Sequence, residues 1–200
     1  MRILLLSLFA LVFGCKNAVD GPATKKSKDY TSYFKAAKEY CKQNKLNTSW
    51  FMLADLSIHS GKKRFYVYNF ESGNFTDTFL VSHGCGNHKW LGDETKESPA
   101  FSNIEESHCS ALGKYILRDR GVSIFGVKTK YLLEGVDESN NKAMKRAIVF
   151  HSLDEINDEE VYPKGAPEGW GCPAVSNHTF TEIDKRLKKE KNNTLLWLIN

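Results

Sequence analysis

The sequence has no two cysteines in the C-x-x-C spacing, although it contains five cysteines. Structural zinc sites usually include such close pairs, so the spacing does not predict a zinc site. The histidines at His83, His88 and His108 are spaced irregularly and the carboxylates are scattered, which makes a metal site from these side chains a poor interpretation. We therefore expect no metal ion.

The chain also lacks a strong net charge. The formal charge is only +4, and no arginine-rich patch interleaved with aromatic residues occurs. Nucleic acid is therefore not an expected partner. There are no internal repeats and no second long apolar run. With 200 residues, 41% of them hydrophobic and 26% charged, the chain suits one domain with a proper core and hardly two.

The first fifteen residues have the pattern of an export signal. A short basic start precedes the apolar run ILLLSLFALVFG, which is too short to span a bilayer. LVFGC, which ends at Cys15, resembles the cleavage site of bacterial lipoproteins; an ordinary signal peptide with an incidental cysteine is the alternative. We expect a lipoprotein signal peptide over residues 1–14, a lipid on Cys15 and a polar tether over 15–28. This predicts a location in the bacterial cell envelope, facing the periplasm or the surface.

Residues 29–200 are expected to form a single, mainly β domain with peripheral helices. Apolar residues at helical spacing predict a helix in 29–44, with Cys41 facing the core, and another in 179–192; SNNKAMKRA (139–147) is typical of a short helix. A long loop, 83–108, is typical of a functional segment. Alternating or continuous apolar runs predict strands, and these runs cover 50–58, 63–70, 75–82, 115–119, 122–127, 130–136, 147–152 and 194–200.

The segment EGWGCPAVS places Cys172 between a glycine and a proline. Such a cysteine could be half of a disulfide, with Cys85 or Cys109 as its partner, or a nucleophile. A nucleophile needs a base nearby and donors for an oxyanion. His151 ends an apolar strand about twenty residues earlier, and the polar, turn-rich sequence between them would allow the chain to return. The residues alone leave both interpretations open.

Four blocks of the sequence, in this order, resemble the murein L,D-transpeptidase catalytic domain proteins. They are LADLSIHSGKKRFYVYNFESGNFTDTFLVSHG, FSNIEESHCSALGKY, LEGVDESNNKAMKRAIVFH and WGCPAVS. The resemblance covers roughly residues 48–180 and implies the β-sandwich-like catalytic fold of that family. It also implies that Cys172 is the nucleophile and His151 its general base.

Further site residues follow from the same blocks. Gly171 matches the glycine just before the nucleophile, and Trp170 could pack over the thiol. His83 in SHG and Asn103 in FSN are candidates for substrate contacts on the opposing loop. The sequence departs from the family at Gly169, where serine is usual.

The function that the resemblance implies is acyl transfer on peptidoglycan stem peptides, a reaction that needs no metal ion and no organic cofactor. An amine acceptor would make the protein a cross-linking L,D-transpeptidase, and water as acceptor would make it an L,D-carboxypeptidase. The alternative is a non-catalytic, lipid-anchored cell-wall-binding protein on the same fold, which the missing serine favours. The expected partners are stem peptides and, through the N-terminal lipid, a membrane; the oligomeric state is not predicted.

Overall fold

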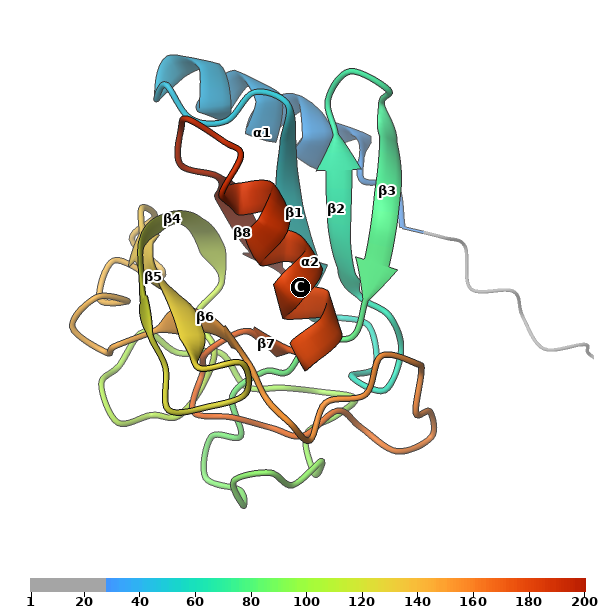
Figure 1. The fold of residues 1–200 in the computed structure, drawn as a ribbon. Helices are drawn as coiled ribbons and strands as arrows, with labels where there is room; N and C mark the ends of the chain where they lie inside the picture. Colours follow the sequence, from blue (N-terminus) through green and yellow to red (C-terminus); the bar gives the residue numbers. More distant parts are fainter. Residues whose placement is uncertain (1–27) are drawn as a thin grey trace, which may run out of the picture.

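Two helices and eight strands make up residues 28–200, the part of the chain that the computed structural model describes (Figure 1). The predicted signal peptide, Cys15 and all but the last residue of the predicted tether lie outside this part. Neither helix in residues 28–200 is long and apolar enough to cross a bilayer. The elements in chain order are α1 (Thr31–Gln43), β1 (Trp50–Asp55), β2 (Phe65–Asn69), β3 (Asn74–Phe79), β4 (Gly113–Val122), β5 (Thr129–Gly135), β6 (Val149–Ser152), β7 (Ala174–Val175), α2 (Asn177–Leu187) and β8 (Leu195–Ile199).

The eight strands form one hydrogen-bonded sheet in the order β3-β2-β1-β8-β4-β5-β6-β7. Two of the pairings, β1 with β8 and β6 with β7, are parallel, and the others are antiparallel. The last strand of the chain, β8, lies between β1 and β4. It therefore joins the N-terminal hairpins to the strands that carry His151 and the segment after Cys172.

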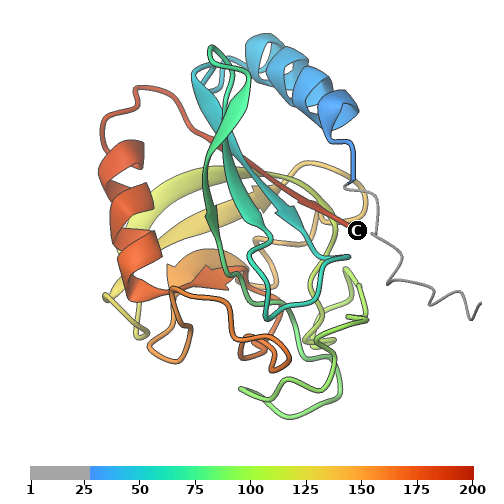
Figure 2. The same ribbon diagram turned by 90° about the vertical axis from the view of Figure 1, so that its right-hand side faces the viewer.

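Period-two alternation along β1 separates two hydrophobic cores. Met52 and Ala54 face the core that also contains residues of α2, whereas Phe51 and Leu53 face the core under α1. All four side chains are fully buried. Figure 2 shows the consequence, with α1 and α2 on opposite sides of the sheet. The expected position of Cys41 on the buried face of α1 is confirmed.

The sheet folds over on itself. Phe65 in β2 and Phe150 in β6 stand far apart in the strand order, yet their rings stack with centroids 5.8 Å apart and planes within 4°. This contact is possible only if the two halves of the sheet face each other across the core. The predicted fold class, a single mainly β domain of sandwich-like form with peripheral helices, is confirmed.

Two expectations about local structure are wrong. Residues 139–147 form successive turns, mostly closed by hydrogen bonds between residues three apart, rather than a helix. Residues 123–127 form the turn between β4 and β5, so the predicted strand 122–127 contributes only Val122 to β4. Gly126 and Lys128 have positive φ angles of 47° and 60°, which a continuing strand does not allow.

The stacked pair across the folded sheet predicts a large effect on stability. Phe65→Ala should lower the free energy of unfolding by about 3–5 kcal/mol, because it removes the stacked contact and leaves a cavity. Urea unfolding followed by fluorescence measures this change. As a control, Ile104→Ala, at a side chain that is 68% exposed, should stay within about 0.5 kcal/mol of the wild type. A loss below about 1 kcal/mol for Phe65→Ala would contradict close packing at this contact.

Candidate active site

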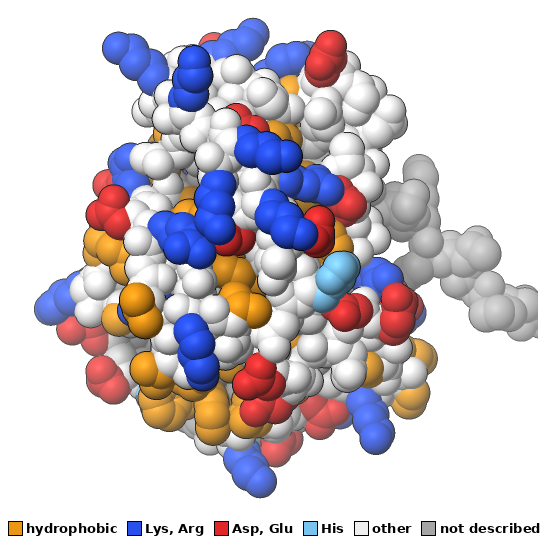
Figure 3. All heavy atoms as spheres, in the orientation of Figure 1, with side chains coloured by type: hydrophobic (Ala, Val, Ile, Leu, Met, Phe, Trp, Pro, Cys, Tyr) orange, Lys and Arg blue, Asp and Glu red, His pale blue; other side chains and the backbone are white. Residues whose placement is uncertain are grey.

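Cys172 and His151 both line a cavity of about 380 Å³. Trp90, from the 83–108 loop, forms part of its wall, as expected for that loop. In the space-filling view, apolar side chains gather at the lower end of the molecule, where the loops and the β4–β5 turn lie (Figure 3). The residues of the lining that matter for the chemistry are Cys172, His151, Trp170, Trp90, Ser82, Phe125, Lys130 and Arg146.

The register of β6 and β7 sets the relative positions of the two predicted catalytic side chains. The strands run parallel, with His151 opposite Ala174, so Cys172 lies level with Val149, two residues before His151. The Val149 amide accordingly donates to Cys172 Sγ over 3.4 Å. Two residues of strand correspond to about 6–7 Å. Within residues 28–200 no hydrogen bond joins Sγ to the His151 ring, so the expected direct contact is not present in this conformation.

His151 is held in one tautomer by its own strand. Its Nδ1 lies 2.9 Å from the Ser152 carbonyl oxygen. A carbonyl can only accept, so Nδ1 carries the hydrogen and Nε2 is left as the acceptor. Burial lowers the pKa of His151, opposed by the Ser152 carbonyl. The ring is therefore neutral at pH 7 and has the protonation state of a general base.

Cys172 is a half-buried free thiol, and none of the four cysteines in residues 28–200 forms a disulfide. Burial raises the pKa of the Cys172 thiol, while the Val149 amide and the positive charges of Arg146 and Lys130 act in the opposite direction. The resting side chain is thus a neutral thiol at pH 7. A base must take its proton before Sγ becomes a good nucleophile.

Two cationic side chains in the cavity were not singled out from the sequence. Lys130 lies on β5 opposite His151, and Arg146 is fixed by donating to the carbonyl oxygens of Ser102 and Cys109 at 2.9 and 2.6 Å. Of residues 28–200, those that line the cavity include no aspartate or glutamate. This gives the cavity a positive potential suited to an anionic group. Among residues 28–200, no three His, Cys, Asp or Glu side chains gather as a metal site would require.

The glycines of the motif have different roles. Gly171 has φ of 98°, and a Cβ there would lie 2.5 Å from the Cys109 carbonyl oxygen. Its missing side chain therefore makes room for the protein's own backbone rather than for a ligand. At Gly169 a Cβ would meet nothing closer than 4.0 Å, so a serine would fit. The Ser82 hydroxyl, which donates to the Cys172 carbonyl over 3.3 Å, already supplies a hydroxyl to this loop.

Of the predicted substrate contacts, only Trp170 lines the cavity. It lies at the rim, 59% exposed, with its ring 6.2 Å from that of Trp90 and stacked on His108 at 5.1 Å. His83 is fully buried and outside the cavity, which contradicts its interpretation as a substrate contact. Asn103 is also outside the cavity, because its amide donates to the carbonyl oxygen of Glu138 and ties the loop to the following turns.

A comparison with family models identifies the class of protein. The model described as the L,D-transpeptidase catalytic domain matches residues 23–196. The chain belongs to this family and is thus a catalytic domain of the L,D-transpeptidase type. No curated protein matches the sequence.

Solved structures with a similar fold come from several bacteria. Bd1075 of Bdellovibrio bacteriovorus is 13% identical, with 77% of this chain and 48% of that chain aligned and a TM-score of 0.46. The helical cell shape determining protein Pgp2 of Campylobacter jejuni is 12% identical, with 80% of this chain and 54% of that chain aligned and a TM-score of 0.45. An L,D-transpeptidase of Mycobacterium tuberculosis H37Rv is 12% identical, with 76% of this chain and 58% of that chain aligned and a TM-score of 0.43. The chain spans about half the length of the first two of these structures.

The site predicts a selective and pH-dependent thiol reaction. Iodoacetamide should alkylate Cys172 long before Cys41, because Cys41 is fully buried and burial raises the pKa of its thiol to about 12. The rate at Cys172 should still be rising above pH 9, since its thiol pKa is also raised. Intact mass and peptide mapping between pH 6 and 10 measure both rates. A rate that levels off by pH 7 would show a preformed thiolate and contradict the neutral resting state.

Proposed function

We propose that this protein performs cysteine-dependent acyl transfer on peptidoglycan stem peptides. The observation that carries the proposal is the open cavity in which the Cys172 thiol and the neutral His151 ring lie on adjoining strands, within the blocks that resemble the family's catalytic motif. The membership of the chain in the L,D-transpeptidase catalytic domain family supports the same chemistry. Cys172 is the nucleophile and His151 the general base.

The first half-reaction transfers the acyl group to sulfur. His151 Nε2 takes the thiol proton, and Sγ attacks the carbonyl carbon of the diamino-acid residue in a tetrapeptide stem. The Cys172 amide N–H, which forms no hydrogen bond within residues 28–200, donates to the oxyanion. When the oxyanion collapses, the C–N bond breaks and His151 returns the proton to the amine of the leaving D-alanine. A thioester on Cys172 remains.

The second half-reaction frees the enzyme. An amine of a neighbouring stem attacks the thioester carbonyl, His151 takes the proton of the attacking amine, and Sγ leaves and regains a proton from His151. The product is a cross-link. Water in place of the amine gives a trimmed stem and makes the same site a carboxypeptidase.

The approach of the thiol to the base requires a local rearrangement. Sγ lies level with Val149 and donates to the Ala147 carbonyl oxygen over 3.9 Å. Catalytic hydrogen bonds are commonly long before substrate binds and shorten in the complex. The positive charges of Lys130 and Arg146 favour the thiolate once it forms and attract the carboxylates that stem peptides carry.

Acylation by a carbapenem tests this function, because its strained lactam carbonyl accepts a thiolate. The wild type should gain the mass of the drug, and Cys172→Ala should gain none. His151→Ala should be acylated about a hundredfold to ten-thousandfold more slowly, since a positioned base is lost. It should still be alkylated by iodoacetamide at high pH, where the thiolate forms without a base. Equal labelling of wild type and Cys172→Ala would overturn the proposal.

The second candidate is a non-catalytic, lipid-anchored wall-binding protein, which the absence of the family's usual serine at position 169 favours. Gly169→Ser distinguishes the two, because this position has room for the side chain. For the enzyme, the wild type is already acylated, and one added hydrogen bond of about 0.5–1.5 kcal/mol should raise the acylation rate about two- to tenfold. For the wall-binding protein, the wild type is inert and only the variant reacts. Mass spectrometry over time separates the outcomes.

We also propose that the protein acts in the bacterial cell envelope, held by a lipid on Cys15. The apolar run and the LVFGC sequence support this location, and several acyl chains on one residue would give stable membrane attachment.

A further inference from the structure

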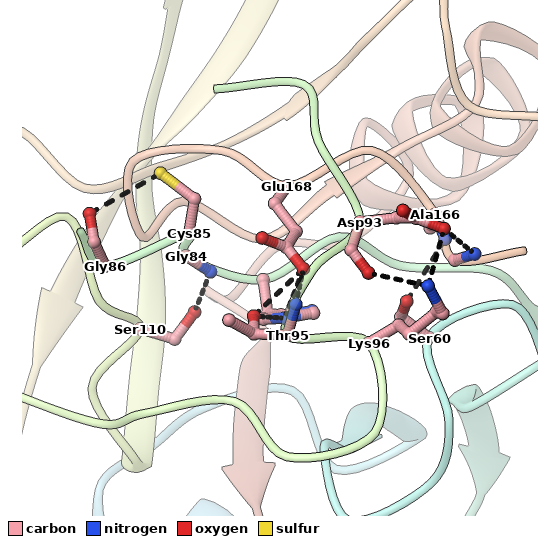
Figure 4. A network of polar contacts seen from close by, with 12 residues as sticks. Ser60, Gly84, Cys85, Gly86, Asp93, Thr95, Lys96, Ser110, Ala166 and Glu168 are labelled. Carbon is pink, nitrogen blue, oxygen red and sulfur yellow. Dashed lines mark hydrogen bonds and ion pairs between the residues drawn. The ribbon is translucent and has the colours of Figure 1, made fainter. Parts of the chain in front are cut away.

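A chain of buried polar side chains lies behind the loop that carries Cys172. Its members are Arg64, His83, Thr95 and Glu168; the ionisable side chains of Arg64, His83 and Glu168 are fully buried, and Thr95 is partly buried. Figure 4 shows Thr95 and Glu168 facing each other across the loop segments. The proposed reaction uses none of these four side chains directly.

The direction of the hydrogen bonds that link these four side chains follows from the donors available. Arg64 can only donate, so His83 Nδ1, 2.7 Å from Arg64 Nη2, is the acceptor and Nε2 carries the hydrogen. Nε2 then donates to Thr95 Oγ1 at 2.8 Å, and Thr95 Oγ1 donates to Glu168 Oε1 at 2.9 Å. Burial and the charge of Arg64 lower the pKa of His83 to about 3, which keeps its ring neutral. A positive end and a negative end are thus joined by two neutral links.

Hydrogen bonds to backbone groups hold Glu168 and the start of the loop that carries Cys172. The Thr95 amide donates to Glu168 Oε1 over 2.6 Å. Glu168 exchanges backbone hydrogen bonds with Gly92 and Leu91, and the next residue, Gly169, donates to the His83 carbonyl oxygen. Residues 168–169 are therefore held from both sides, three residues before the reacting sulfur.

The next residues of the loop are also fixed. The Ser110 hydroxyl donates to the Gly171 carbonyl oxygen over 3.3 Å, and the same oxygen of Ser110 accepts from the Gly84 amide. With the hydrogen bond from Ser82 to the Cys172 carbonyl, the backbone from Glu168 to Cys172 is restrained at nearly every residue.

Stability alone does not explain a buried charge at this place. Glu168 Oε2 has no hydrogen-bond partner in residues 28–200, and a buried carboxyl oxygen left without a partner costs stability. What these four hydrogen-bonded side chains supply is a fixed orientation for the loop that carries Cys172.

We propose that Glu168 and Thr95 are positioning residues that hold the Cys172 backbone amide and sulfur in the geometry that acylation requires. The inference rests on the proposed function. Acylation of a lactam needs both the sulfur and the oxyanion donor in place, whereas alkylation by iodoacetamide needs only a reachable thiolate. Loss of the positioning contacts should therefore slow acylation far more than alkylation.

The test compares the carbapenem acylation rate with the iodoacetamide alkylation rate in matched variants. Thr95→Val removes the hydroxyl that joins His83 to Glu168 and keeps the shape, and Thr95→Ser restores the hydroxyl. Glu168→Leu removes the acceptor of the Thr95 amide and hydroxyl at a similar side-chain size. Thr194→Val, at a buried threonine that accepts from Asn47 near β8, is the same change outside this chain of residues.

Thr95→Val and Glu168→Leu should slow acylation about tenfold to a hundredfold, the usual effect of a small misplacement of reacting groups. Their alkylation rates and the pH dependence of alkylation should stay within about twofold of the wild type on the same argument. Thr95→Ser and Thr194→Val should match the wild type in both reactions. Glu168→Leu provides the same comparison if Thr95→Val does not fold.

Three results would overturn the inference. The first is acylation of Thr95→Val and Glu168→Leu at the wild-type rate. The second is a parallel fall of both rates together with the unfolding midpoint, which would indicate general loss of structure. The third is a shifted pH profile of alkylation, which would indicate an electrostatic effect. A wild type that is not acylated at all would instead overturn the proposed function, and the positioning inference with it.

Discussion

The parallel pairing of β6 with β7 is the contact on which the candidate site depends. It places His151 opposite Ala174, and so it places Cys172 beside Val149, two residues before His151 in β6. Phe150, between Val149 and His151, points to the opposite face and packs in the core. Because alternate residues of a strand face opposite sides, burial of Phe150 commits its two neighbours to the cavity. The same residues that stabilise the sheet therefore orient the candidate base.

The environment of Cys172 balances two demands on a nucleophile. Burial raises the thiol pKa and keeps the resting sulfur protonated, which protects it from indiscriminate oxidation and alkylation. Lys130 and Arg146 favour the charged form, and the Val149 amide adds a hydrogen bond to the sulfur. A neutral His151 completes the set, because a ring that is already protonated could not accept the thiol proton.

Several costly local features surround the site. Gly171 and Ala147 both have positive φ angles, of 98° and 54°, and for alanine this conformation is unfavourable. Glu168 and Arg64 are charged and fully buried. Such features persist only where the surrounding structure holds them in place, and they gather at functional sites more often than elsewhere. The two cores on either side of the folded sheet supply that rigidity.

Most of the strands and both helices could be predicted from the sequence, because periods of 2 and 3.6 residues are local properties of the chain. The errors arose where local pattern was ambiguous: 123–127 is apolar but lies in a turn, and 139–147 has helical composition but forms successive turns. The pairing of Cys172 with His151 as candidates rested on the resemblance of sequence blocks. That resemblance did not reveal that Cys172 and His151 are offset by two residues along the paired strands, because this offset depends on strand register.

The sequence by itself determined the mainly β class of the fold and the buried faces of its helices, since each is carried by residues close together in the chain, and its resemblance to the family supplied the candidate nucleophile and base. Only the tertiary structure decided that His83 is buried against Arg64, that Lys130 and Arg146 converge on the cavity, and that Gly171 makes room for the Cys109 carbonyl. These placements join segments that lie far apart in the sequence. They depend on the insertion of β8 between β1 and β4 and on the folding of the sheet over Phe65 and Phe150, neither of which any local pattern specifies.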